Sequence, residues 1–347
     1  MLLHDSKNEE GITIMREVFQ HACEIKLENG RYLPRRFSEK SMDALSKISP
    51  MFGKLACCTA GISLKFYTDA KEISFDYKYD ILYTLTGGFD VYECGQMVKA
   101  ITLPTESCEG TFTYKKSSPG KTLIEVFLPS NAEIQLWNLQ LGNYHPAPLE
   151  QKDLVLYYGD SLTQSAYITN TSLSWVSRVA RITGTDYINR GIGSLFYDAS
   201  YLDSQEKLNP AFVFVEFGGN DLVKHDADHN VVFLDGVLQH CTLSDIPMLE
   251  QNANTYLSKI KNMYPAANIS VLSHIRGMKP IAPELLEVVN AFNQALQKIA
   301  HKQNLRYIDS ATILTPAQGY YVADNVHYNA EGNAAFAEGL RPYVDAH

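Results

Sequence analysis

The chain has 347 residues, of which 45% are hydrophobic and 20% charged, and its 39 acidic and 30 basic side chains give a net charge of −9. This hydrophobic fraction is ample for packed cores and excludes a disordered or fibrous chain. The acidic excess argues against a nucleic-acid-binding protein, which needs a basic surface to displace counterions from phosphates. Because the length exceeds what one hydrophobic core usually serves, we expect two domains.

The N-terminus and the cysteines favour a cytoplasmic protein with no membrane anchor. The first ten residues, MLLHDSKNEE, turn polar after three positions, so no signal peptide is expected. No run of about 18 apolar residues occurs, so no membrane-spanning helix is expected. Six cysteines in a chain of this size are too sparse for a disulfide framework, and we expect reduced thiols. Export by a route without a signal peptide stays open.

Up to about residue 142, the sequence favours short antiparallel strands separated by turn residues. Several segments alternate apolar and polar side chains, which is the period of a strand with one buried face. The segments are residues 62–67, 73–77, 81–85, 89–92, 111–114, 123–127 and 134–137. In this half, only residues 38–48 show a helical pattern. Short strands at this spacing predict an all-β accessory domain over residues 1–147, with a β-sandwich or jelly-roll fold.

Residues 143–148 contain Pro146 and Pro148 and predict a stiff linker, because proline disfavours both helix and sheet. Beyond the linker, strands alternate with helices. Strand candidates lie at residues 154–158, 187–188, 211–217, 269–272 and 306–308. Two helical stripes lie between them, Leu173, Val176, Val179 and Ile182 before Gly184, and Leu285, Val288, Phe292, Leu296 and Ile299. This order predicts an α/β domain over residues 148–347, with a parallel sheet between helices.

The sequence YGDSLTQ at 158–164 places Ser161 directly after an apolar strand and before a helical stretch. A serine on such a turn lies at the carboxyl edge of the sheet, where the helix N-terminus favours developing negative charge. Taken alone, a serine at a strand end is usually only a helix cap.

The sequence DNVH at 324–327 places Asp324 three residues before His327. An acid at this spacing can fold back and accept the proton of one ring nitrogen, which leaves the other nitrogen as a proton acceptor toward a serine. For an isolated pair, a loop histidine beside a helix-capping aspartate would be the simpler interpretation. The strand-end serine reverses that preference.

Two further blocks follow the second and third predicted strands. They are NRGIGS at 189–194 and EFGGND at 216–221, and both fall at the edge where open α/β sheets place ligand sites. Their glycines let the backbone approach a substrate closely, and Asn220 offers an amide that could donate to an oxyanion. Taken singly, each block could also be ordinary turn chemistry.

The order of these four blocks resembles the GDSL or SGNH hydrolase superfamily. The resemblance implies a flavodoxin-like three-layer fold that hydrolyses esters, often acetyl groups on carbohydrates. It implies Ser161 as nucleophile, His327 as base and Asp324 as the partner that orients the base. It also implies an oxyanion hole that includes the Asn220 side chain and the Ser161 backbone N–H.

One position departs from the family's pattern. The second block usually ends in a glycine whose backbone N–H completes the oxyanion hole, and by register from Asn189 that position here is Ser194. A backbone donor survives this change where the dihedral angles are tolerable. Whether Ser194 or the preceding Gly193 donates is left open by the sequence.

A sandwich before such a domain also resembles a subset of bacterial SGNH esterases that carry a Gly-x-Asp-Leu-Tyr-like segment there. The sequence GFDVY at 88–92 is similar to it, with Val91 in place of leucine. This resemblance makes Asp90 and Tyr92 candidates for substrate binding. Tyr167, close to the serine in sequence, is a third candidate, and a role in core packing is the alternative for all three.

Other polar groups are weaker candidates. His225, Asp226 and His229 are metal-ligand types, but their polar surroundings favour a solvated loop over a metal site. Glu216 lies inside an apolar strand and needs a partner if it is buried. Asp160 and Asp221 are expected to orient turns. No phosphate-binding loop and no nicotinamide or flavin fingerprint occurs, so we expect no cofactor.

Together these features predict a metal-independent serine esterase for short-chain O-acyl esters, acetyl esters foremost, on a sugar or oligosaccharide. The alternatives are a carbohydrate-binding protein with an inactive hydrolase domain, and a lipase or thioesterase of the same superfamily. The edge strands of the sandwich leave a homo-oligomer possible. Neither a nucleic acid nor a membrane is expected as a partner.

Overall fold

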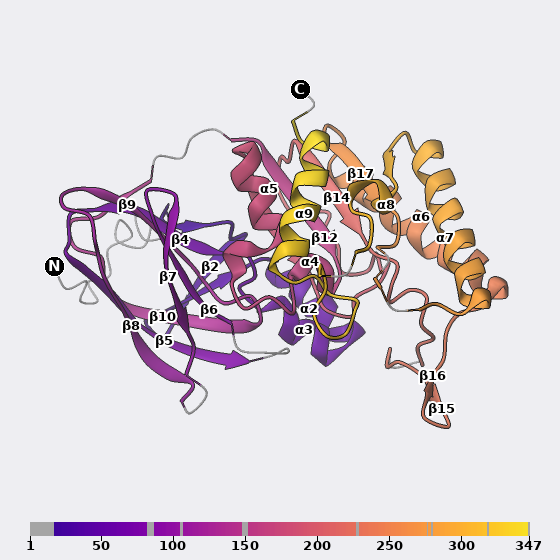
Figure 1. Cartoon of the computed structure of the whole chain (residues 1–347), viewed down its shortest axis with the longest axis horizontal. Coiled ribbons are helices and arrows are strands. Elements are labelled where there is room, and N and C mark those ends of the chain that lie inside the picture. Colours follow the sequence, from indigo (N-terminus) through magenta and orange to yellow (C-terminus); the bar gives the residue numbers. More distant parts are fainter. Residues whose placement is uncertain are drawn as a thin grey trace.

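A computed structural model describes residues 17–81, 87–104, 107–147, 152–226, 229–275, 277–278, 280–317 and 319–345. The N-terminal part is a sandwich of antiparallel sheets, and the C-terminal part is a parallel sheet with helices on both faces (Figure 1). Both halves of the predicted fold class are confirmed. Within the described part of the chain, no helix has the length and apolar character that a membrane span requires.

The two sheets of the sandwich share one buried core. Alternate side chains such as Phe66 and Val126 from one sheet meet Phe75 and Leu136 from the other. The first sheet contains, in spatial order, β1 (Phe19–Gln20), β4 (Ser63–Thr68), β9 (Thr122–Phe127), β6 (Gly88–Glu93) and β7 (Gln96–Thr102), with β11 (His145–Pro146) also paired to β4. The second contains β2 (Glu24–Glu28), β3 (Arg31–Arg35), β10 (Ala132–Gln140), β5 (Glu72–Ile81) and β8 (Glu109–Lys115). Residues 82–85 of one predicted strand and Pro148 of the predicted linker lie outside the described residues.

The parallel sheet has the strand order β13-β12-β14-β17-β18. In chain order this is 2-1-3-4-5, the flavodoxin-like arrangement that the sequence predicts. The strands are β12 (Leu154–Gly159), β13 (Asp186–Gly191), β14 (Phe212–Glu216), β17 (Asn268–Leu272) and β18 (Arg306–Ile308). The order reverses between β12 and β14, so a ligand site is expected outside the carboxyl ends of these two strands.

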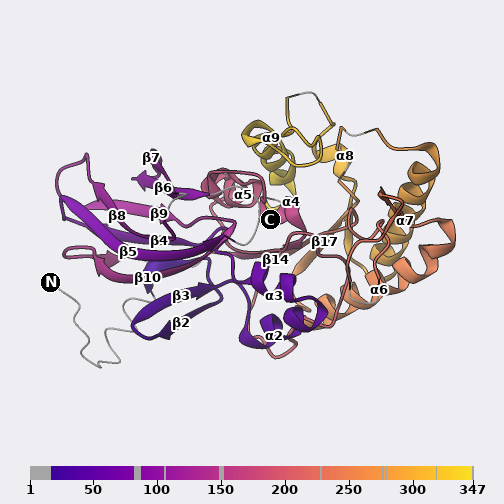
Figure 2. The same cartoon turned by 90° about the horizontal axis from the view of Figure 1, so that it is seen from below.

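Helices cover both faces of this sheet (Figure 2). Val155 and Tyr157 of β12 pack toward α5 and α9, whereas Leu156 and Tyr158 pack toward α6 and α7. The helices are α4 (Ser161–Gln164), α5 (Trp175–Thr183), α6 (Ile246–Met263), α7 (Pro283–Lys302), α8 (Ser310–Ile313) and α9 (Ala330–Leu340). The predicted stripe in α7 is confirmed, and that in α5 is confirmed for Val176, Val179 and Ile182, whereas Leu173 lies in the preceding 3₁₀ turn. Gly184 ends α5 in the left-handed conformation with φ 71°.

Two helices from the N-terminal half also belong to the core of the parallel sheet. Helix α2 (Glu39–Ile48) matches the predicted helical stretch, and α3 (Pro50–Ala56) follows it. Their buried side chains Leu45, Phe52 and Leu55 share a core with Leu156 and Tyr158. The division at residue 147 stays a prediction, but the α/β core draws on side chains from before that position.

Arg36 is a fully buried link between the two halves. Its Nη1 donates to the carbonyls of Asn189 and Gly191, 2.8 and 2.7 Å away, at the end of β13. Its Nε and Nη2 donate to Cys58 and Leu55 carbonyls at 2.6 and 3.0 Å. Burial lowers the pKa of Arg36 to about 10, so the guanidinium stays charged at neutral pH. The carbonyl dipoles of four backbone positions therefore solvate this charge in place of water.

We expect Arg36→Met to lower the free energy of unfolding by at least about 3 kcal/mol, because it leaves several buried carbonyls without donors. Urea unfolding followed by tryptophan fluorescence measures the change. The matched control is Lys99→Ala on the exposed face of β7, which should stay within about 0.5 kcal/mol of the parent. Equal effects of the two substitutions would contradict a stabilising role for the Arg36 contacts.

Candidate active site

Ser161 is the first residue of α4 and follows β12 by a tight turn. Asp160 caps the helix, because its carboxylate accepts from the Leu162 N–H at 2.9 Å. Gly159 has no room for a side chain, since a Cβ there would lie 2.1 Å from Thr163 Oγ1 and 2.5 Å from the Glu216 carbonyl. The turn thus places Ser161, 9% exposed, at the edge where the strand order reverses.

The structure brings Ser161, His327 and Asp324 into one hydrogen-bonded chain. Ser161 Oγ lies 2.7 Å from His327 Nε2, and His327 Nδ1 lies 2.6 Å from Asp324 Oδ2. The other Asp324 oxygen accepts from the backbone N–H groups of Val326 and His327 at 2.8 and 3.0 Å. Asn325 adopts φ 59°, and this left-handed residue lets the acid fold back onto the histidine.

The electrostatics suit proton transfer from the serine. Burial lowers the pKa of His327, although the neighbouring Asp324 carboxylate acts in the opposite direction. Burial also opposes the charge of Asp324, but the N–H groups of His327 and Val326 and the imidazole outweigh it and lower the pKa of Asp324. At neutral pH the imidazole is therefore neutral beside an ionised acid. It donates from Nδ1 to Asp324 and accepts at Nε2 from the Ser161 hydroxyl.

In the block 189–194, the structure distinguishes the two backbone N–H groups, of Gly193 and Ser194, that could donate to an oxyanion. The Gly193 N–H donates to Gln164 Oε1 at 2.7 Å, so it is already engaged. Among the described residues, none accepts a hydrogen bond from the Ser194 N–H. Ser194 has φ 65°, a left-handed conformation that glycine adopts without strain. Asn189 fixes the block by accepting from the Gly191 N–H at 2.9 Å.

Asn220 lies next to the serine turn, but its amide is directed at protein acceptors. Its Nδ2 is 3.1 Å from Asp160 Oδ2 and 3.2 Å from the Leu195 carbonyl. These contacts join the first, second and third blocks. For Asn220 to donate to an oxyanion as predicted, one of these two hydrogen bonds must be exchanged for the substrate oxygen.

Of the three predicted substrate-binding residues, the structure brings only Tyr167 to the site. The Tyr167 ring lies 4.1 Å from the His327 ring, centroid to centroid, at 31°. Asp90 is fully buried and Tyr92 is 5% exposed. Tyr92 packs against Phe127, and the Arg181 guanidinium lies 5.3 Å from its ring centre. Substrate binding by Asp90 and Tyr92 stays a prediction, and in this structure both side chains contact other protein groups.

The two histidines of the segment 225–229 lie beside the ring of Phe196. The ring centres of His225 and His229 lie 4.9 and 5.6 Å from that of Phe196. Asp226 accepts from the Asn230 backbone at 3.0 Å. In the described part of the chain, no group of three or more His, Cys, Asp or Glu side chains could hold a metal ion.

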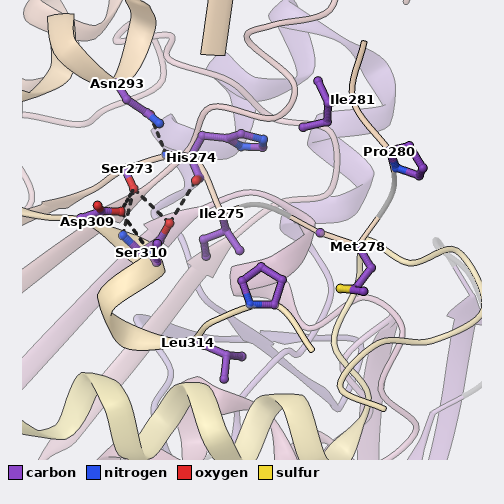
Figure 3. A pocket seen from close by; sticks show the side chains of 13 residues that line it. Ser273, His274, Ile275, Met278, Pro280, Ile281, Asn293, Asp309, Ser310 and Leu314 are labelled. Carbon is purple, nitrogen blue, oxygen red and sulfur yellow. Dashed lines mark hydrogen bonds between the residues drawn. The ribbon is translucent and has the colours of Figure 1, made fainter. Parts of the chain in front are cut away.

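A cavity of about 370 Å³ adjoins the site on the side of β17 (Figure 3). It is lined by Ser273, His274, Ile275, Gly277, Met278, Pro280, Ile281, Asn293, Asp309, Ser310, Ala311, Leu314 and Pro316. Its wall touches the histidine loop, since the Met278 N–H donates to the Asn325 carbonyl at 2.8 Å. It also touches the third block, because a Cβ on Gly218 would lie 3.0 Å from that of His274.

The sequence does not single out these cavity residues. Their position after β17 and β18, at the same carboxyl edge as Ser161, is the signal that could have found them.

Three buried carboxyl groups lie beneath the serine turn. Asp160, Glu216 and Asp221 are 4%, 2% and 6% exposed. Glu216 finds the partner that its strand position requires in Thr163, whose hydroxyl donates to it at 2.7 Å. Asp221 accepts from the Tyr197 N–H at 2.9 Å.

These carboxyl groups hold protons far more tightly than exposed ones do. Burial raises the pKa values of Asp160 and Asp221 to about 7. Burial, together with repulsion from Asp160, raises the pKa of Glu216 well above its ordinary value. Burial therefore favours the protonated form of Glu216.

Since an unfolded Glu has a pKa of about 4.3, unfolding above that pH releases the proton that the folded state holds on Glu216. The free energy of unfolding should therefore fall as the pH rises from about 5 toward the folded pKa, by about 1.4 kcal/mol per pH unit for one retained proton. Glu216→Gln keeps the shape and should flatten this slope, measured by urea unfolding. Glu284→Gln, an exposed change at the start of α7, is the control and should keep the parent slope. Identical slopes in all three proteins would show that Glu216 is ionised when folded.

Comparisons with known proteins agree with this geometry. Residues 157–335 match the model of the GDSL-like lipase/acylhydrolase family. A search of curated proteins finds no match.

Solved structures of similar fold span almost the whole chain. The salicylyl-acyltransferase SsfX3 of a tetracycline biosynthetic pathway is 18% identical with a TM-score of 0.76, and 94% of each chain is covered. A protein described as a GDSL-like lipase from Bacteroides ovatus is 15% identical, with a TM-score of 0.67 and 95% of this chain and 94% of that chain covered. A family two carbohydrate esterase from Cellvibrio japonicus is 14% identical, with a TM-score of 0.64 and 96% of each chain covered. The structures share the fold, and the family match covers more than half of the sequence: the chain belongs to the GDSL-like lipase/acylhydrolase family.

Proposed function

We propose that this acylhydrolase is a serine esterase that removes short acyl groups, acetyl foremost, from a sugar or oligosaccharide. The observation that carries the proposal is the hydrogen-bonded chain from Ser161 through His327 to Asp324, with distances of 2.7 and 2.6 Å. A serine that hydrogen-bonds to a neutral imidazole, itself oriented by an ionised acid, is the arrangement that activates a hydroxyl nucleophile.

In the proposed reaction, Ser161 Oγ attacks the ester carbonyl while His327 Nε2 takes its proton. Asp324 stabilises the imidazolium that forms, and the imidazolium then gives the proton to the leaving alcohol. Water, activated by His327, hydrolyses the acyl-enzyme and regenerates the free serine. The backbone N–H groups of Ser161 and Ser194 and the Asn220 amide would hold the oxyanion.

The substrate class is supported by the fold and by the cavity. A structure of similar fold is a family two carbohydrate esterase. The cavity beside the histidine loop, about 370 Å³, has the size of a small-molecule site and mixes polar with apolar walls. Both observations favour a small, polar ester over a long-chain lipid. A non-catalytic sugar-binding protein is disfavoured, because such a protein has no need of an aligned serine and histidine.

We expect Ser161→Ala to lower kcat/KM for p-nitrophenyl acetate by at least about 10³-fold, since it removes the nucleophile. A fluorophosphonate probe should label the parent protein and not the variant. The control is Ser200→Ala, an exposed serine that should keep parental turnover and labelling. Parental turnover in Ser161→Ala would reject the proposed function. Faster hydrolysis of the octanoyl than of the acetyl ester would reject the short-chain preference and favour a lipase.

The oxyanion hole can be tested at Ser194. We expect Ser194→Gly to keep or raise kcat, because the backbone N–H remains and glycine adopts φ 65° without strain. Ser194→Val should lower kcat, since a β-branched residue resists the left-handed conformation. Asn220→Ala should lower kcat by about 10²–10³-fold, the usual effect of losing one donor. If Ser194→Gly loses as much activity as Asn220→Ala, the serine side chain rather than its backbone contributes.

A further inference from the structure

The loop that follows the candidate nucleophile is attached to the β-sandwich by Asp90. This loop, residues 165–170, connects α4 to the 3₁₀ turn Thr171–Leu173. The Asp90 carboxylate, on β6, accepts from Asn170 Nδ2 at 2.6 Å and from the Ser172 N–H at 3.0 Å. Asp90 has no exposed surface. A carboxylate so buried in the sandwich is stable only while the loop supplies these donors.

A second attachment comes from the turn between β9 and β10. Asn131 Nδ2 donates to the Ala166 carbonyl at 2.6 Å, and Ser130 Oγ lies 2.6 Å from Thr171 Oγ1. Both Asn131 and Ser130 are 1% exposed, so these hydrogen bonds are shielded from water. The sandwich therefore holds the loop at its start, through Asn131, and at its end, through Asp90.

Between these two attachments the loop touches the reacting groups. The ring of Tyr167 lies over His327 at 4.1 Å. The Ala166 N–H donates to the carbonyl of Ser161 at 3.0 Å. A shift of the loop would therefore move the ring that covers the imidazole and the backbone of the serine itself.

We propose that Asp90 and Asn131 of the β-sandwich are positioning residues of the active site, which hold loop 165–170 so that Tyr167 packs on His327. This inference rests on the proposed function, in which His327 is the base. In this proposal the sandwich supports the loop beside the active site and is not a separate binding module.

The packing of Tyr167 has a measurable consequence. Tyr167 is the titratable group on the face of the imidazole, and Asp324 is the charged group that acts on it. Burial lowers the pKa of His327. Uncovering the ring should raise that pKa toward its ordinary value, and the acid limb of the kcat/KM profile should then move to higher pH.

The experiment compares Asp90→Asn and Tyr167→Ala with the parent enzyme on p-nitrophenyl acetate. Asp90→Asn replaces one of the two accepting oxygens by an NH₂ group, so Asn170 or Ser172 loses its acceptor. We therefore expect the loop to detach from the sandwich. Both variants should lower kcat by about 10- to 100-fold with a smaller change in KM, and both should move the acid limb to higher pH. Their effects should not add in the double variant, because they act through one contact. Tyr167→Phe keeps the ring and should recover most of kcat.

The matched control is Asp76→Asn. Asp76 lies on β5 of the same sandwich and accepts from Thr111 and Asn138 at 2.7 Å each, and neither partner belongs to the loop. This variant should keep the kcat, the acid limb and the thermal stability of the parent. Chymotrypsin gives a readout without turnover, because it should cleave at Tyr167 in Asp90→Asn faster than in Asp76→Asn.

Parental kcat, acid limb and cleavage rate in Asp90→Asn would overturn the inference, as would fully additive effects in the double variant. If Asp90→Asn does not fold, Tyr167→Ala alone still decides, since an unchanged acid limb would overturn the proposed contact. Failure of the proposed function has a different signature, which is parental turnover in Ser161→Ala.

Discussion

The Ser161 hydroxyl and the His327 ring are 166 positions apart in the chain and 2.7 Å apart in space. Their hydrogen bond can form only if the carboxyl end of β12 and the loop before α9 meet at one edge of the sheet. The reversal of strand order between β12 and β14 opens that edge, and the Asp160 cap then turns Ser161 toward it. The hydrogen bonds of Asn189 and Asn220 hold residues 189–195 beside these two segments.

Much of that support comes from residues before position 147. Arg36 holds the carbonyls at the end of β13, directly before residues 192–194. Asp90 and Asn131 hold the loop 165–170 that follows the serine. Leu45 and Phe52 complete the core beneath the same sheet. The catalytic edge is thus enclosed by both halves of the chain. An α/β half on its own would lack the hydrogen-bond partners that Arg36, Asp90 and Asn131 supply to the segments beside Ser161.

The strands and helices with a regular hydrophobic pattern could be predicted, because such a pattern is visible within a short stretch of sequence. The apolar runs of β12 and β14 and the stripes of α5 and α7 identified the parallel sheet and its helices. The spacing of Asp324 and His327 likewise identified their contact. Helix α6 was not predicted, since its buried positions alternate with many polar residues and no glycine marks its end. The roles of Arg36 and Asn131 could not be predicted either, because their partners lie 153 and 35 positions away and no local pattern names them.

The site contains four carboxyl groups, and their surroundings divide them into two kinds. Asp324, whose side chain is 33% exposed, accepts backbone N–H groups that lower its pKa, which would suit its proposed role beside an imidazolium. Glu216, with Asp160 and Asp221 around it, is buried, and burial favours its protonated form. An oxyanion forming beside Asn220 would be repelled by ionised groups this close, in a medium where water screens little. A proton held by Glu216 would lower the negative charge beneath the proposed oxyanion hole. The same burial that makes these groups costly for folding at alkaline pH is what makes them compatible with negative charge on the substrate.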